Sequence, residues 1–306
     1  MEDDGSMPFQ KASKAQAKAR LGLIGPAGSG KTYTALRIAS ALGARIAVID
    51  TEHGSASKYA DEFAFDTLQL TSFHPQRYVE AIEEAGQAGY DVLIIDSGSH
   101  EWNGTDGCLE LAEQAAARYK GNKWAGWRDV TPLHNRFIEA IHAAPLHVIV
   151  TYRSKMEYIQ TDTGHGKTEV KKVGMEAITR DGAEYELDIV GELDLQHRMA
   201  ITKTRCKALT DQVIDHPGDA FAGVVQRWLS DGNTPPAAPI SEAQVKALWQ
   251  EAQRHLPPLD VAGITAFANK FLGTTYANPR ALSHDEAERV LDAIKHDTGT
   301  PQQAAG

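Results

Sequence analysis

Residues 25–32 read Gly-Pro-Ala-Gly-Ser-Gly-Lys-Thr, which is a complete G-x-x-x-x-G-K-[ST] motif. In a loop with this spacing, backbone N–H groups surround an anion, and the helix that follows points its positive end at the same place. We expect Lys31 to reach the β- and γ-phosphates of a nucleotide and the Thr32 hydroxyl to hold Mg²⁺. The motif predicts a nucleoside triphosphate site, for which the candidate binding residues are Gly25, Pro26, Ala27, Gly28, Ser29, Gly30, Lys31, Thr32 and Tyr33.

A carboxylate is expected to complete the magnesium site. The apolar run at 92–95 ends at Asp96, as is typical of a Walker B strand. We expect this strand to lie beside the strand that leads into the phosphate-binding loop, so that Asp96 and Thr32 bind Mg²⁺ together. A simple cap at the end of a buried strand is the alternative role for Asp96.

Hydrolysis of a triphosphate also needs a group that orients the attacking water. Asp50, Glu52 and Glu101 are the candidates, because the residue directly after Asp96 is Ser97, which carries no carboxylate. We favour Glu52, which stands just past the second apolar run, since the carboxyl ends of parallel strands converge on the ligand crevice. Its alternative role is to cap the turn that follows that strand.

The elements that must position these residues alternate between strands and helices. Buried-strand patterns occupy residues 21–24, 45–50, 92–96 and 146–151, and helical patterns occupy 33–42, 75–88, 109–119 and 132–143. This alternation predicts an α/β fold with a mainly parallel sheet that is covered on both faces. Beyond residue 152 we expect hairpins or meandering strands, with strand-like runs at 185–195 and 197–203 and a closing helix at 218–229.

The chain is expected to contain a large α/β domain and a small helical one. Ser241 with Gln244, and Ser283 with Glu286, have the spacing of helix capping boxes, and apolar stripes of helical period follow them. We expect a flexible basic lead-in at 1–19 (with 1–6 left over from a cloning vector), the α/β domain at 20–230, a Pro-rich linker at 231–240, the helical domain at 241–296 and a disordered tail at 297–306.

Composition argues against several classes of protein. The 306 residues are 42% hydrophobic, which is ample for a core, but no apolar run approaches the ~20 residues of a membrane span. Cys108 and Cys206 stand far apart without a C-x-x-C pair or a histidine cluster. Their spacing argues against structural zinc and a disulfide framework, and it is consistent with a reducing cytoplasm. Because the formal net charge is −10, a nucleic-acid site would have to be a local basic patch.

The segment from Arg153 to Arg180 contains such a patch and predicts a site for single-stranded DNA. A basic loop that also carries Tyr152 and Tyr158 can follow a single strand by phosphate contacts and base stacking. The candidate DNA-binding residues are Lys155, Lys167, Lys171, Lys172 and Arg180. Acidic residues dilute the charge, so an ordinary exposed hairpin is the alternative. A second candidate, with a solvated segment as its alternative, is the lead-in with Lys11, Lys14, Lys18 and Arg20.

Several segments resemble RecA-type recombinases. Ile-Asp-Thr-Glu-His-Gly at 49–54 is similar to the segment that bears their catalytic glutamate, and Ile-Thr-Lys-Thr-Arg at 201–205 is similar to the strand that carries their paired cations. With Asp-Ser at 96–97 and Thr-Tyr-Arg-Ser-Lys at 151–155, residues 18–230 resemble the phage RecA-like ATP-binding proteins of the Sak single-strand-annealing group. The C-terminal region resembles a small accessory module of phage recombination proteins.

The resemblance implies a RecA-like P-loop NTPase core that hydrolyses ATP with Mg²⁺. Glu52 would be the catalytic glutamate, and Lys203 and Arg205 would reach the γ-phosphate held by a neighbouring subunit; a solvated strand edge is the alternative for that pair. Arg153 would sense the γ-phosphate, where the cellular enzymes carry glutamine. The implied partners are single-stranded DNA, further copies of the chain in a filament or ring, and a single-strand-binding protein. The implied location is a host bacterial cytoplasm, away from membranes.

Two other functions fit a phosphate-binding loop. A P-loop small-molecule kinase would need a second pocket and a lid of arginines, for which Arg118 and Arg128 are too few. A nucleotide-gated adaptor, such as a helicase loader, would bind ATP without hydrolysing it.

Overall fold

The computed structural model describes residues 17–162, 168–232, 240, 242–255 and 261–296, with the backbone alone described for 156–162, 168–175, 184, 242–243, 255 and 296. The chain divides into two compact units, Met1–Asn233 and Thr234–Gly306. The expected lead-in, apart from Ala17 to Ala19, and the expected tail lie outside the described residues.

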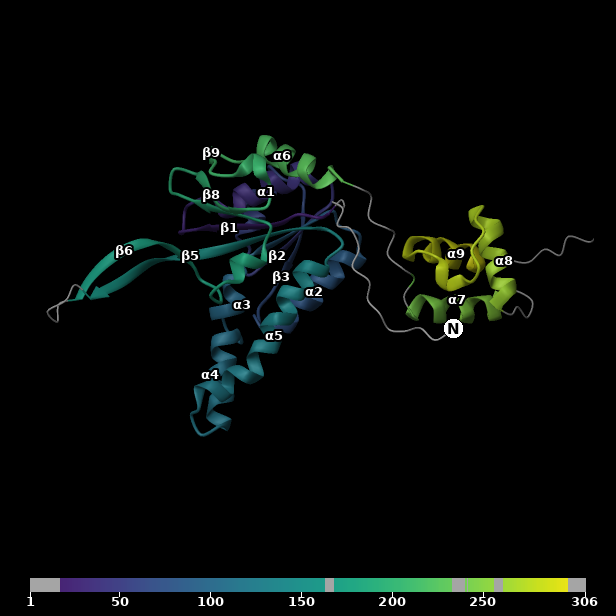
Figure 1. The fold of residues 1–306 in the computed structure, drawn as a ribbon, viewed down its shortest axis with the longest axis horizontal. Helices are drawn as coiled ribbons and strands as arrows, with labels where there is room; N and C mark the ends of the chain where they lie inside the picture. Colours follow the sequence, from purple (N-terminus) through teal and green to yellow (C-terminus); the bar gives the residue numbers. More distant parts are fainter. Residues whose placement is uncertain (1–16, 163–167, 233–239, 241, 256–260, 297–306) are drawn as a thin grey trace, which may run out of the picture. The chain divides into compact units, whose positions relative to one another are not determined.

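A nine-stranded sheet forms the centre of the first unit, within the described residues (Figure 1). Its strands are β1 (Arg20–Gly25), β2 (Ile46–Asp50), β3 (Asp66–Gln69), β4 (Val92–Asp96), β5 (His147–Asp162), β6 (Thr168–Ala177), β7 (Ile189–Leu193), β8 (Arg198–Thr204) and β9 (Val213–Asp215). The order is β3-β2-β4-β5-β1-β7-β8-β9, and β6 pairs with the outer half of β5. The strands from β3 to β7 in this order run parallel, whereas β8 pairs antiparallel with both β7 and β9.

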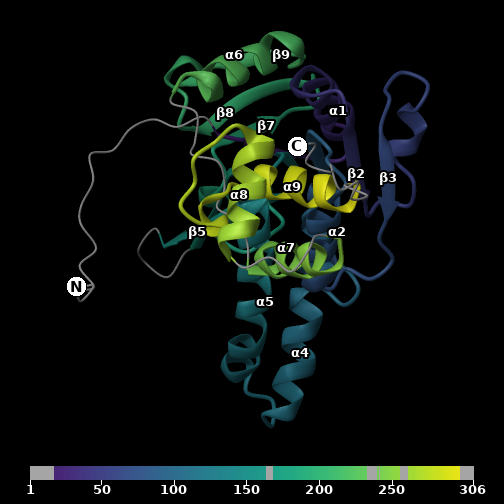
Figure 2. The same ribbon diagram turned by 90° about the vertical axis from the view of Figure 1, so that its right-hand side faces the viewer.

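Helices cover both faces of the sheet. They are α1 (Lys31–Leu42), α2 (Pro75–Gln87), α3 (Ser99–Asn103), α4 (Cys108–Arg118), α5 (Lys123–Ala143) and α6 (Asp219–Ser230), with short 3₁₀ turns at Ala56–Tyr59, Ala183–Glu186 and Lys207–Leu209. One core lies under α1 and α6, and another lies under α2 and α5. Helix α4 and the first part of α5 form a hairpin that projects from the body (Figures 1 and 2). The result is the three-layer arrangement of an α/β P-loop NTPase.

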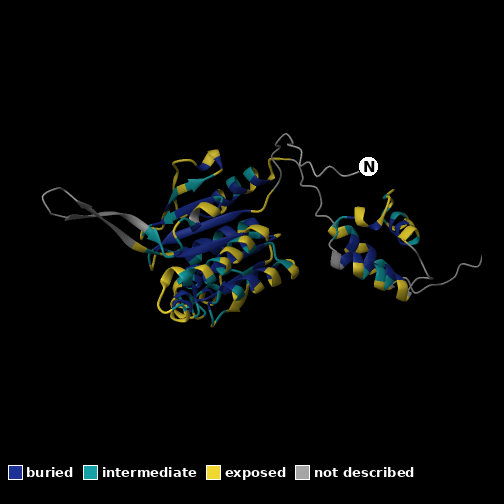
Figure 3. Ribbon diagram, turned by 60° about the horizontal axis from the view of Figure 1, so that its bottom comes forward, coloured by how far each residue is buried: buried dark blue, intermediate teal, exposed yellow. Residues whose placement is uncertain are grey.

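Strand β4 shows why the central strands read as unbroken apolar runs. Successive side chains of a strand point to opposite faces, so a strand that is covered on both sides buries all of them. Val92 and Ile94 belong to the core under α1, and Leu93 and Ile95 belong to the core under α2. The buried centre and the exposed outer helix faces are visible in Figure 3.

The expected strands at 21–24, 45–50 and 92–96 and the helix at 75–88 are confirmed within two residues. Three expectations are wrong. The run at 185–195 is a 3₁₀ turn followed by the shorter β7, and the helix expected at 132–143 already begins at Lys123, where the Asn122 side chain accepts from the Ala125 N–H at 3.3 Å. The strand that ends at Asp96 does not lie beside the phosphate-loop strand, because β5 separates β4 from β1. Short elements such as β3 and α3 were not expected.

The second unit is helical. It contains α7 (Glu242–His255), α8 (Val261–Leu272), a 3₁₀ turn at Pro279–Ala281 and α9 (His284–His296). Apolar side chains from all three helices, among them Leu248, Ile264 and Val290, form its core. The predicted capping box before α9 is confirmed, since the Ser283 N–H donates to Glu286 Oε2 at 2.9 Å and the Glu286 N–H donates to Ser283 Oγ at 3.3 Å. Ser241 of the other predicted box lies outside the described residues.

No helix within the described ranges combines the length and the apolar character needed to cross a bilayer.

Arg20 begins β1 and is buried, so it is no part of an exposed basic lead-in, which corrects the expectation for this residue. Its guanidinium donates to the carbonyl oxygens of His142 (2.9 Å), Ala144 (2.6 Å) and Leu146 (2.9 Å). These carbonyls lie at and just beyond the end of α5, where the helix supplies no partners of its own. Arg20 therefore joins the end of α5 to the start of the phosphate-loop strand.

Replacing Arg20 with methionine tests this role. We expect Arg20→Met to lower the free energy of unfolding of the larger unit by about 2–3 kcal/mol, because buried carbonyl oxygens lose their donors. Urea denaturation followed by tryptophan fluorescence measures the change. Arg77→Met is the control, since Arg77 is exposed and pairs with Glu80 at 2.9 Å, and we expect it to change stability little. Equal stability of the two variants would contradict the role.

A candidate nucleotide site at the carboxyl end of the sheet

The phosphate-binding loop runs from the end of β1 to the start of α1. Gly28 and Gly30 both have φ of 82°, in the left-handed region that side chains with a Cβ rarely adopt. A Cβ on Gly30 would also lie 2.9 Å from His197 Nδ1. The loop closes with a hydrogen bond from the Ser29 N–H to the Pro26 carbonyl oxygen at 3.3 Å. The expected order of strand, glycine-rich loop and helix is confirmed.

The Lys31 ammonium lies inside this loop. Its Nζ donates to the carbonyl oxygens of Gly25 and Pro26, both at 2.9 Å. Burial lowers the pKa of Lys31, and the carboxylates of Asp96 and Glu52 oppose that shift. Among the described residues, the hydrogen-bond partners of the ammonium are these two carbonyl oxygens, and a phosphate would be a stronger partner for it.

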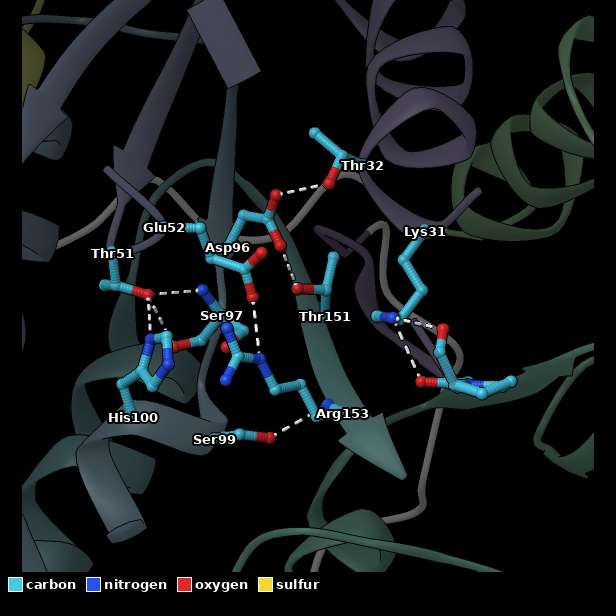
Figure 4. Close-up of polar contacts among 12 residues, drawn as sticks. Lys31, Thr32, Thr51, Glu52, Asp96, Ser97, Ser99, His100, Thr151 and Arg153 are labelled. Atoms are coloured by element: carbon cyan, nitrogen blue, oxygen red, sulfur yellow. Dashed lines mark hydrogen bonds and ion pairs between the residues drawn. The ribbon is translucent and has the colours of Figure 1, made fainter. Parts of the chain in front are cut away.

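Asp96 is the polar centre of the site. Thr32 Oγ1 donates to its Oδ2 at 2.6 Å, and Thr151 Oγ1 donates to its Oδ1 (Figure 4). Burial raises the pKa of the Asp96 carboxyl, and the two hydroxyl donors oppose the rise. One carboxylate thus joins α1, β4 and the intervening strand β5.

The donor set fits a magnesium ion. Mg²⁺ prefers hard oxygen ligands, and a carboxylate and a hydroxyl from the phosphate loop are the usual protein contribution beside phosphate oxygens. Thr32 and Asp96 already lie within hydrogen-bond distance of each other at the mouth of the loop. Both predicted metal residues are therefore brought together.

Glu52 and Arg153 meet across the pocket. Arg153 Nε lies 2.9 Å from Glu52 Oε1, although the two residues are 101 positions apart in the chain. The Asp50 carboxylate accepts from the Glu52 N–H at 2.7 Å and from the Ala56 N–H at 3.3 Å, so it fixes the turn that carries Glu52. Glu101 is fully buried away from the pocket. Of the three carboxylates considered for orienting water, Glu52 is the one that lines the pocket.

A layer of hydrogen bonds supports these two side chains, and its members were not predicted. Thr51 Oγ1 accepts from the Ser97 N–H at 2.7 Å and lies 2.6 Å from His100 Nδ1. Burial and then the charge of Arg153 lower the pKa of His100. The Arg153 N–H donates to Ser99 Oγ at 2.9 Å. The first turn of α3 thus anchors the backbone beside Glu52 and the backbone of Arg153 itself.

The pocket bounded by these groups has a volume of about 550 Å³. It is lined by Ala27, Gly28, Gly30, Lys31, Thr32, Tyr33, Glu52, Ser55, Tyr59, Asp96, Arg153, Ser154 and Ile178. The Tyr33 ring packs edge-on against Tyr59, with ring centroids 5.5 Å apart. Every residue from Gly25 to Tyr33 except Gly25, Pro26 and Ser29 lines the pocket, and those three shape the loop behind it.

Lys203 and Arg205 do not line this pocket. The Lys203 ammonium donates to the carbonyl oxygens of Tyr185 and Leu187, and Arg205 pairs with Asp188 at 2.6 Å. The Arg205 N–H donates to the Asp188 carbonyl oxygen, and the Asp188 N–H donates to that of Arg20. Arg205 therefore lies level with the start of β1, about 17 Å along the strand from the phosphate loop.

Of the predicted DNA-binding residues, Lys155, Lys171 and Lys172 lie on the ribbon made by β5 and β6, which extends from the sheet (Figure 1), and Arg180 lies beyond the end of β6. Lys155 pairs with Glu176 at 3.2 Å, and Arg180 NH1 donates to Asn135 Oδ1 at 3.4 Å. Lys171 and Lys172 lie on β6 opposite Ile159 and Tyr158, with only their backbone described. Lys167 is outside the described residues, as are Lys11 and Lys14 of the lead-in.

Substituting a loop glycine tests the nucleotide site. Gly30→Ala should weaken ATP binding at least tenfold, because a Cβ is strained at φ 82° and approaches His197. Gly121→Ala is a matched control, since Gly121 has φ of 84° and nothing within 4 Å of its Cβ position. Titration with a fluorescent ATP analogue measures both. Equal loss in the two variants would show that backbone strain, and not the loop, decides binding.

Comparison with known proteins places the chain in one family. Residues 17–215 match a protein family described as an AAA domain. Among solved structures, the chain is similar to one described as the crystal structure of the RadB recombinase, with 14% sequence identity and a TM-score of 0.36 over 62% of this chain and 83% of that chain. No curated protein matches the chain. The fold assignment therefore rests on the strand order and loop of the chain itself.

Proposed function

The chain belongs to the AAA domain family, and we propose that it is a RecA-like ATPase that binds single-stranded DNA and shares its active sites between subunits. The observation that carries the ATPase proposal is a single pocket lined by the phosphate loop, Lys31, Thr32, Asp96, Glu52 and Arg153. This set contains an anion cradle, two oxygen ligands for a cation, a carboxylate for the attacking water and the positive charge of Arg153.

In the proposed reaction, the oxygen of a water molecule bonds to the γ-phosphorus while the bond to the β-phosphate oxygen breaks, giving ADP and inorganic phosphate. Mg²⁺ held by Thr32 and Asp96 would neutralise charge on the phosphate oxygens. Lys31 exchanges its two carbonyl partners for β- and γ-phosphate oxygens. The Glu52 carboxylate accepts a hydrogen bond from the water and aligns it for in-line attack.

Arg153 gives this site a control. Its guanidinium is paired with Glu52, and a γ-phosphate in the same pocket would compete for it as a more highly charged anion. Transfer of Arg153 to the γ-phosphate frees the Glu52 carboxylate for water. Glu52 would then be available only when a triphosphate is bound, which supports Arg153 as the sensor.

Glu52→Gln separates binding from hydrolysis. We expect the variant to bind ATP nearly as well as the unaltered protein, but to hydrolyse it at least about 100-fold more slowly, because an amide orients water poorly. Binding is measured by titration and hydrolysis by phosphate release. Glu83→Gln, which changes an exposed carboxylate on α2 outside the pocket lining, is the control and should retain turnover. Unchanged turnover in Glu52→Gln would remove the catalytic role and favour a nucleotide-gated adaptor.

Shared active sites are supported by the position of Lys203 and Arg205. Charge that develops on the γ-phosphate needs cations close to it. Pairing through β7 places Lys203 level with Gly22 of β1 and Arg205 level with Arg20, so the two lie about 10 and 17 Å along the sheet from the loop of their own chain, and neither lines its pocket. We infer that they serve catalysis from another copy. A filament or a ring would supply such neighbours.

Mixing two inactive variants tests whether active sites are shared between subunits. Lys31→Ala chains cannot hold the phosphates but keep Lys203, whereas Lys203→Ala chains keep the phosphate site. An equal mixture should recover about a quarter of full activity, because random assembly places the two intact halves together at one interface in four. Phosphate release over a range of mixing ratios gives the answer. Absence of recovery at every ratio would count against action in trans.

Single-stranded DNA binding is supported by the ribbon of β5 and β6. Arg153 stands at its root, and the pairing with β6 begins one residue later at Ser154. DNA that holds the ribbon in one position would therefore also act on the strand that carries Arg153. This continuity offers a route by which DNA stimulates hydrolysis.

Lysines on the ribbon allow a direct test. We expect Lys171→Ala with Lys172→Ala to weaken binding of a fluorescent single-stranded oligonucleotide several-fold and to reduce the salt dependence of binding, because fewer phosphates are neutralised. Anisotropy titrations at several salt concentrations measure both effects. The control removes the same charge at exposed sites elsewhere, Lys207→Ala with Lys270→Ala. Equal effects of the two pairs would place the DNA site away from the ribbon.

The cellular use of such an ATPase is the most specific part of the proposal. The motif order that resembles the Sak group supports annealing or recombination of single strands, in a bacterial cytoplasm and beside a single-strand-binding protein. The role of Glu52 distinguishes this function from a helicase-loader type of adaptor, which has no need for turnover.

A further inference from the structure

Three side chains with metal-binding atoms meet where α3, α4 and α5 come together. Glu101 lies in α3, Cys108 begins α4 and His134 lies in α5. Cys108 Sγ is 3.0 Å from Glu101 Oε1, and His134 Nδ1 is 3.1 Å from both oxygens of the same carboxylate. Carboxylate, thiolate and imidazole are the three side-chain ligands that zinc uses in proteins. The three residues form what we call the ECH cluster.

The ECH cluster is buried. Glu101 and Cys108 have no exposed surface, and His134 is 3% exposed. Cys108 and His134 both contact the Glu101 carboxylate, so one ligand atom from each of the three residues converges in a closed site. A divalent cation with a thiolate, a carboxylate and a neutral imidazole would bring the total charge to zero.

The surroundings of the ECH cluster also favour an added link. The apolar core next to it is small, with Cys108, Ala112 and Val130 buried and Trp102, Leu111 and Trp127 partly buried. Next to it, α4 and the first half of α5 project from the body of the protein, downward in Figure 2. Short projecting units with little core are commonly held by a structural metal or another cross-link. A metal here would bind one residue from each of the three helices.

We propose that Glu101, Cys108 and His134 bind a zinc ion that fixes the α4–α5 hairpin to α3. A thiolate combined with imidazole and carboxylate suits Zn²⁺ better than Mg²⁺ or Ca²⁺, which take oxygen ligands. Around tetrahedral zinc the ligand atoms stand about 3.3–3.5 Å apart, so the observed hydrogen-bond separations need to widen by only about half an ångström. Water would complete the fourth position, as in other sites with three protein ligands.

The zinc site would also border the nucleotide site along the chain. Glu101 directly follows His100, whose ring contacts Thr51, and Ser99 holds the Arg153 backbone. The metal would therefore hold the middle of the same short helix α3. The inference itself does not depend on hydrolysis or on DNA binding, because it rests on the ECH cluster alone.

Metal analysis of the tag-free, full-length protein tests the proposal. Protein purified with zinc and then dialysed against excess Mg²⁺ without free zinc should keep about one zinc per chain by mass spectrometry of the metal. Replacement by Co²⁺ should give the absorption band of cobalt bound to a thiolate. Cys108→Ser should lose the cobalt band and His134→Gln should lose the metal. Cys206→Ser, which removes the other buried cysteine, should keep both.

Two outcomes would overturn the site. Unaltered protein with under about a tenth of a zinc per chain and no thiolate band after exposure to Co²⁺ would show that the ECH cluster is a hydrogen-bonded core element. Metal retained in full by Cys108→Ser and His134→Gln would place the ion elsewhere. If these variants fail to fold, the cobalt spectra of the unaltered protein and of Cys206→Ser decide the matter. Metal content is read independently of ATPase activity, so the two proposals fail separately.

Discussion

The buried carboxylate of Asp96 is the contact on which the nucleotide site depends. Its two oxygens accept from Thr32 at the start of α1 and from Thr151 on β5. Strand β5 lies between β4 and the phosphate-loop strand β1. The Asp96 side chain therefore reaches past β5 to contact Thr32 at the end of the loop. Burying an ionised carboxylate without hydrogen-bond donors is costly in free energy. Here two other elements, α1 and β5, each supply a hydroxyl donor. The start of α1 is thereby held at a fixed place above the strand ends.

The same edge of the sheet brings the reactive groups together. Glu52 lies just beyond the end of β2, and Arg153 lies on β5 opposite Gly25, the last residue of β1. The first turn of α3 then holds the backbone next to both, through His100 and Ser99. Glu52 and Arg153 form an ion pair in this pocket. In the mechanism that we propose, a γ-phosphate competes for Arg153 and releases the Glu52 carboxylate, so that one side chain couples binding to hydrolysis.

The features predicted best from the sequence are those that a local sequence pattern determines. The phosphate loop follows from its own spacing, and strands such as β4 follow from unbroken apolar runs that end at a carboxylate. The start of helix α5 was predicted too far along the chain, because proline is common at the first position of a helix. In the structure Pro132 lies inside the helix, which begins at Lys123 and packs against α4. Arg20 reads as one more basic residue of the lead-in, and its burial follows from the end of α5, which lies more than 120 residues away in the chain.

Contacts between residues far apart in the chain could not be predicted from local sequence patterns. The neighbours of β5 depend on the order of the strands in the sheet. The position of Thr151 between Asp96 and the loop could therefore not be predicted from the spacing of residues in the sequence. The ECH cluster shows the same limit for metal ligands. Its members come from three helices and have none of the short spacings that mark a zinc site in sequence, which is why the two cysteines argued against zinc. Pairing of Arg153 with Glu52 is also a product of the fold.

The central claim is that hydrolysis is completed by a second copy of the chain. The most direct measurement is the rate of ATP hydrolysis per chain across protein concentration, with and without single-stranded DNA. The account predicts a rate per chain that rises with protein concentration, rises further with DNA and loses the effect of DNA at high salt. A rate per chain that is constant over the whole concentration range and indifferent to DNA would contradict it and would indicate a self-contained active site.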